Sequence, residues 1–117
     1  MSQFPKIQTA IPRQRFVIGD YTATILGEVE STDYPGYFFI AAFVPEGKTE
    51  PVLYICSEKN LPKDRHNGVA RLRVVNQAMS EIMEVDDKWK DLHQFSEQAI
   101  KMGAEFLGLQ NEQVVPL

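Results

Sequence analysis

The run from Tyr37 to Val44 reads YFFIAAFV, and its only polar group is the Tyr37 hydroxyl. A strand sends alternate side chains to opposite faces of its sheet, so this run is apolar on both faces. One face would carry Tyr37, Phe39, Ala41 and Phe43, and the other Phe38, Ile40, Ala42 and Val44. Both faces therefore have to be covered, which constrains the architecture and the partners of the chain rather than its chemistry.

Turn signals around this run predict an antiparallel meander. Gly19-Asp20 is a two-residue hairpin signal between two apolar stretches. The expected strands cover residues 15–18, 21–30, 37–44 and 52–57. Short connections between consecutive strands favour pairing in sequence order.

The segments at either end of this meander are less regular. Residues 1–12 contain Pro5 and Pro12 and little periodicity, so we expect an irregular arm before a sheet region at 13–75. The stretch 69–84 fits a helix with an apolar stripe, or a strand that turns Arg71 and Arg73 away from its apolar residues. Its β-branched residues favour a strand at 69–75, followed by a helical turn or an edge strand.

Residues 86–108 predict a long C-terminal helix. Its apolar stripe recurs at steps of three and four and consists of Trp89, Leu92, Phe95, Ala99, Gly103 and Phe106. A carboxylate of Asp86 or Asp87 can cap the first turn, and Gly108 marks the end. Gly103 costs about 1 kcal/mol relative to alanine, which we attribute to close approach of the helix to the sheet. The predicted fold class is α+β: an antiparallel β-meander of four to five strands with a long C-terminal helix packed on one face.

The uncovered face of this sheet determines what we expect of partners. If Tyr37, Phe39, Phe43 and Tyr54 share it, roughly 600 Å² of aromatic surface is open. Two copies meeting there would bury about 1,200 Å², the lower end of a specific interface. We therefore expect a homodimer through the sheet. The alternatives are a helix at 69–84 that covers this face of a monomer, and an apolar groove for a ligand or peptide.

Composition and charge narrow the class of protein. The 117 residues have the size of one domain, which we place at 1–117. Cys56 is the only cysteine, which excludes an intrachain disulfide and fits a reducing compartment. Because we find neither a signal-peptide pattern nor about 18 consecutive apolar residues, we expect a cytoplasmic protein that does not enter a membrane. The net charge of −4 argues against nucleic acid as a partner.

The residues that carry chemistry do not assemble into a catalytic site. His66 and His93 lack a metal-binding spacing, and His93 can pair with Glu97 one turn along the helix. We find no phosphate-binding glycine loop, dinucleotide fingerprint or nucleophile elbow. We therefore predict no catalytic residue, no metal and no cofactor, and expect a binding role rather than an enzyme.

These features favour a small protein-interaction or assembly module. A small-molecule-binding domain with a pocket between sheet and helix, lined by Trp89 and Tyr54, is an alternative. In general profile, a small, acidic, dimeric α+β chain also resembles bacterial secretion chaperones, which implies an unfolded protein as partner. The candidate ligand- or partner-binding residues are Tyr37, Phe39, Phe43, Tyr54, Arg71, Arg73 and Trp89.

Overall fold

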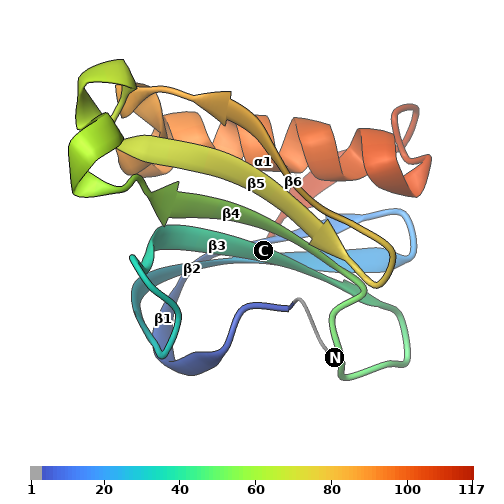
Figure 1. Ribbon diagram of the computed structural model, residues 1–117. Helices are drawn as coiled ribbons and strands as arrows, with labels where there is room; N and C mark the ends of the chain where they lie inside the picture. Colours follow the sequence, from blue (N-terminus) through green and yellow to red (C-terminus); the bar gives the residue numbers. More distant parts are fainter. Residues whose placement is uncertain (1–3) are drawn as a thin grey trace.

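Within residues 4–117, which the computed structural model describes, a seven-stranded antiparallel sheet is crossed on one face by a single α-helix (Figure 1). The strands are β1 (Ile7–Ile18), β2 (Tyr21–Ser31), β3 (Tyr37–Pro45), β4 (Leu53–Lys59), β5 (Ala70–Asn76), β6 (Ser80–Val85) and β7 (Val114–Pro116). The helix is α1 (Leu92–Leu107), and the 3₁₀ turns are η1 (Pro62–Asn67) and η2 (Asp87–Lys90). The spatial order β6-β5-β4-β3-β2-β1-β7 follows the sequence except that β7 returns beside β1. The predicted α+β class is confirmed as a meander-like antiparallel sheet with one 16-residue helix near the C-terminus.

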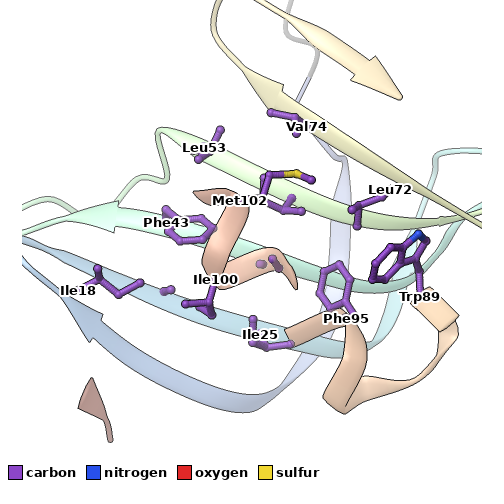
Figure 2. Packing of buried hydrophobic residues seen from close by; sticks show 14 of the residues in the cluster. Ile18, Ile25, Phe43, Leu53, Leu72, Val74, Trp89, Phe95, Ile100 and Met102 are labelled. Carbon is purple, nitrogen blue, oxygen red and sulfur yellow. The ribbon is translucent and has the colours of Figure 1, made fainter. Parts of the chain in front are cut away.

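The larger core lies between α1 and the sheet. Phe43 of β3 and Phe95 of α1 are fully buried in it, and Trp89 of η2 closes one end (Figure 2). Gly103 sits directly over the Phe43 ring, because a Cβ atom added to this glycine would lie 2.1 Å from Phe43 Cζ. The prediction that Gly103 marks a close approach of helix and sheet is therefore confirmed.

The face opposite α1, which we call the second face, is covered by the chain's own N-terminal end. Phe4 packs against Tyr54, with 5.2 Å between the ring centroids, and Ile7 joins the same cluster. Figure 1 shows the segment before β1 running along the sheet on the side away from the helix. Three register shifts in the pairing of β1 with β2 interrupt the regular ladder, and irregularities of this kind bend a strand. Ile40 and Cys56 are fully buried beneath this cover.

An irregularity in β3 changes the faces expected for its side chains. The register with β4 shifts between Tyr37 and Phe39. Phe38 and Phe39 consequently both pack toward the α1 core, whereas Tyr37 joins the second face. The predicted single row of Tyr37, Phe39, Ala41 and Phe43 is therefore wrong at its first position, because one irregularity inverts the alternation before it.

The irregular arm expected at 1–12 is wrong for residues 7–12, which belong to β1. Pro12 fits a strand there because β7 pairs only with residues 16–18, which leaves the outer side of β1 without a described neighbour at Pro12. A proline is tolerated at such an edge because no ladder hydrogen bond needs its missing N–H. Residues 1–3 of the expected arm lie outside the described part of the chain.

The stretch 69–84 forms the hairpin of β5 and β6. The Asn76 side chain closes its turn by accepting hydrogen bonds from the backbone N–H groups of Ala78 and Met79, both at 2.8 Å. The strand interpretation of 69–75 is confirmed, and the alternative of a second covering helix is wrong. With β6 and β7 the sheet has seven strands rather than four to five.

The helix predicted at 86–108 is divided into two segments. Asp86 caps only η2, by accepting a hydrogen bond from the Lys88 N–H at 2.9 Å. The Asp91 side chain accepts one from the Gln94 N–H, and α1 begins directly after it. Gly108 ends α1 in a left-handed conformation, as predicted.

Gly103→Ala is expected to destabilise the fold, although alanine is the better helix former. The gain in helix propensity is about 1 kcal/mol, whereas a methyl group forced into the space of the Phe43 ring costs about 1–3 kcal/mol or more. We expect a net loss in the free energy of unfolding, measured by urea denaturation. Glu105→Ala on the exposed side of α1 is the control and should change the free energy of unfolding by less than about 0.5 kcal/mol.

Phe43→Leu combined with Gly103→Ala should lower the free energy of unfolding by less than the sum of the two single changes. A Gly103→Ala variant more stable than the parent would contradict the contact.

Candidate functional site

The seven candidate residues predicted from the sequence lie on both faces of the sheet. The α1 side holds Phe39, Phe43 and Trp89, and the second face holds Tyr37, Tyr54, Arg71 and Arg73. Phe43 is fully buried, and Trp89 is only 3% exposed. The open patch of Tyr37, Phe39, Phe43 and Tyr54 on which the expected homodimer rested is therefore absent.

The predicted pocket between sheet and helix does not have the expected lining. Trp89 and Tyr54 are on opposite faces of the sheet and cannot line one cavity. A hollow of about 460 Å³ does lie at the margin of α1 and β1, with Phe16, Ile100 and Val114 in its lining. This hollow is mainly apolar, and two pairs of polar side chains at it are already bonded, Ser96 to Gln14 at 2.6 Å and His93 to Glu97 at 3.4 Å.

On the second face, Glu58 of β4 lies beside two arginines of β5. The strand register places Glu58 directly opposite Arg71, and Arg73 points to the same face two residues along β5. Arg73 Nε donates to Glu58 Oε2 at 2.9 Å, and Arg73 Nη2 donates to Oε1 at 3.2 Å. Arg71 Nη2 donates to the same Oε1. Sequence reasoning missed Glu58, although alternation along β4 from Tyr54 and Cys56 could have placed it on this face.

This cluster of three side chains carries an unbalanced positive charge. Glu58 is 8% exposed, and a carboxylate buried to this extent needs a charged or hydrogen-bonding partner. It meets two guanidinium groups, so one positive charge is left over. The side chains of Arg71 and Arg73 are only 16% and 23% exposed. Arg71 Nε is buried and has no hydrogen-bond partner among the described residues.

A pocket of about 340 Å³ opens beside this cluster, and we call it the second-face pocket. Its lining consists of Phe4, Lys6, Asp33, Tyr34, Tyr37, Glu58, Arg73 and Ser80. Asp33 Oδ2 accepts hydrogen bonds from the Tyr37 hydroxyl and from the Lys6 backbone N–H, both at 2.8 Å. Arg73 Nη1 donates to Ser80 Oγ at 3.2 Å. The pocket thus joins the N-terminal segment, the β2–β3 connection and the β4–β5–β6 part of the sheet.

Burial determines the proton states of two groups on this face. Burial, followed by the hydrogen bond to Asp33, raises the pKa of Tyr37 well above its usual range, so the phenol remains a hydrogen-bond donor. Burial also raises the pKa of the Cys56 thiol, which is completely enclosed. A neutral, enclosed thiol is a poor nucleophile, so Cys56 has a packing role.

The remaining chemistry-bearing residues do not gather into a second site. The predicted pairing of His93 with Glu97 is confirmed on the exposed side of α1. Within residues 4–117 no three His, Cys, Asp or Glu side chains are placed to hold a metal ion. No helix in this part of the chain is long and apolar enough to cross a membrane.

Comparison of the chain with protein-family models, with curated proteins and with solved structures finds no match.

Glu58→Ala is expected to lower the free energy of unfolding by about 3 kcal/mol, because it leaves two partly buried guanidinium groups without their carboxylate. Glu84→Ala is the matched control. It removes a carboxylate 3.7 Å from Lys88 in a pair whose side chains are 45% and 41% exposed, and should cost less than about 1 kcal/mol. Urea denaturation at pH 7 compares the two. Losses of equal size would contradict the buried ion-pair description.

The fold is expected to lose stability in alkali. In the unfolded chain Cys56 ionises near pH 9 and Tyr37 near pH 10, whereas burial keeps both protonated in the folded chain. The folded state then binds more protons than the unfolded state, so the free energy of unfolding falls as the pH rises above about 9.

Urea denaturation between pH 7 and pH 11 measures the slope of the free energy of unfolding against pH. Tyr37→Phe should make it shallower above pH 10, and Tyr34→Phe, at a ring that is 79% exposed, is the control. An unchanged slope in Tyr37→Phe would contradict the burial of this phenol.

Proposed function

We propose that the protein is a small-molecule-binding domain that holds a planar, ring-containing anion in the second-face pocket. The observation that carries this proposal is the surplus positive charge around the buried Glu58, at the wall of a pocket that also contains aromatic rings. The volume of the pocket falls within the range of about 300–1,000 Å³ that small-molecule sites occupy.

The anionic group is inferred from the charges at the pocket. The pocket lining contains two cationic side chains, Lys6 and Arg73, and two anionic ones, Asp33 and Glu58. Arg71, which is paired with Glu58 outside the lining, adds the third positive charge. The chain as a whole carries a net charge of −4, so the positive balance is local. Of the five N–H groups of Arg73, three are used by Glu58 and Ser80, and two remain for a ligand. A carboxylate or phosphate is the group that such a guanidinium binds most strongly.

The planar ring is inferred from the aromatic part of the lining. Phe4, Tyr34 and Tyr37 all contribute to the pocket. Tyr34 is 79% exposed, although its ring is large and mostly apolar. A flat ligand stacked on Tyr34 would cover it, and aromatic pairs contribute about 0.5–1.5 kcal/mol beyond their buried area.

The other functions expected from the sequence receive less support. A homodimer through the sheet remains a prediction, but the aromatic patch that motivated it is divided between two faces. A secretion-type chaperone needs an open apolar strip, whereas Phe4 and Ile7 already cover the apolar part of the second face.

NMR titration of the full chain tests the proposal. The anionic probes are indole-3-acetate and adenosine monophosphate, and their neutral counterparts are indole-3-acetamide and adenosine. We expect at least one anionic probe to bind with a sub-millimolar Kd and to shift backbone amide resonances around Tyr37 and Arg73. The neutral counterpart should bind about tenfold more weakly, because it lacks the charged contact. The two anions distinguish a carboxylate from a phosphate ligand.

Two exposed positions allow variants that leave the fold intact. Lys6→Gln and Tyr34→Ala should each weaken binding several-fold, since both side chains line the pocket and are exposed. Lys48→Gln, also exposed and outside the pocket, is the matched control for the lost charge. The proposal is overturned if no anionic probe binds at millimolar concentration, if neutral and anionic probes bind equally, or if the shifted resonances lie over α1.

A further inference from the structure

The outer edge of β6 has no neighbouring strand among the described residues. β6 ends the strand order on one side, and the three-residue β7, which pairs only with residues 16–18 of β1, ends it on the other. Backbone N–H and C=O groups on a free edge can pair with an added strand. The six residues of β6 are long enough for a typical strand pairing.

The side chains of β6 differ in character between its two faces. Glu81 pairs with Val74 and Glu84 with Leu72, so both glutamates lie on the α1 side of the sheet. Ile82 pairs with Arg73 and therefore lies on the second face. Met83 falls at the register shift between these pairs, and Ile82 and Met83 are 44% and 46% exposed. An added strand would thus meet acidic groups on one face and an apolar group on the other.

The charge on β6 disfavours a second copy of this chain as the occupant. An antiparallel pair of β6 strands would bring four glutamates together within one short ladder, and like charges across strands are destabilising. Glu81 has no ion-pair partner among the described residues, and Glu84 has only the Lys88 ammonium at 3.7 Å. We infer that β6 is the docking edge for an extended segment of a partner protein in which basic side chains alternate with apolar ones. This inference is independent of the ligand proposed for the second-face pocket.

Three synthetic nonapeptides and the full chain test the inference. The first alternates lysine and valine, the second has glutamate in place of lysine, and the third has the composition of the first with lysines and valines in separate blocks. By fluorescence anisotropy, the alternating lysine peptide should bind at least about tenfold more tightly than the other two, and its affinity should fall as salt is added. Hydrogen exchange should slow at backbone amides of β6 when this peptide is present.

Two matched charge reversals separate a specific edge from general attraction to an acidic protein. Glu81→Lys should weaken binding of the alternating lysine peptide and strengthen binding of the glutamate peptide. Glu105→Lys, at an exposed position of α1, should change neither. The inference is overturned if the blocked or acidic peptide binds equally well, if none binds, or if protection appears along β1 instead. It is also overturned if light scattering shows a dimer whose β6 amides are protected without peptide, since a second copy would then occupy the edge.

Discussion

The apolar character of β3 and β4 on both faces is the constraint on which the rest of the structure depends. One helix covers one face, with Gly103 bringing α1 down onto Phe43. The chain covers the other face itself, because β1 bends at its register shifts and carries Phe4 and Ile7 toward Tyr54. This N-terminal cover does not reach across the whole second face. The pocket lies where the cover ends, between Phe4 and the charged side chains of β4 and β5.

The charged cluster beside that cover is not accounted for by stability. Buried ion pairs are frequently no more stabilising than apolar side chains of similar size, because desolvation offsets the Coulomb attraction. Apolar residues in place of Glu58, Arg71 and Arg73 would simply extend the small core formed by Cys56 and Val75. Two arginines on one carboxylate also leave a positive charge without a partner. The anion site that we propose for the second-face pocket gives this surplus a physical role that packing does not.

Local patterns were enough to predict much of the fold. Alternation and turn signals located the central strands, and helical spacing with Gly108 located α1. The site was harder to predict, because it depends on which residues face each other across strands. One irregularity in β3 moved Tyr37 to the face opposite Phe39, and the pairing of Glu58 with Arg71 follows only from the β4–β5 register. β7 has three residues, too few for any period to show.

The free edge of the sheet at β6 also bears on which partners the chain can bind. Charged side chains and a bulge, as found on β6 at Glu81, Glu84 and Met83, are devices that keep natural sheet edges from aggregating. Protection against aggregation and recognition of a partner are compatible at this edge. Charge of one sign repels copies of the same chain and attracts a segment of the opposite sign. Protection alone gives no reason to expose Ile82 and Met83 between the two glutamates. Apolar groups at a sheet edge favour association. The exposure of Ile82 and Met83 between two glutamates is therefore better explained by a partner segment that is both basic and apolar.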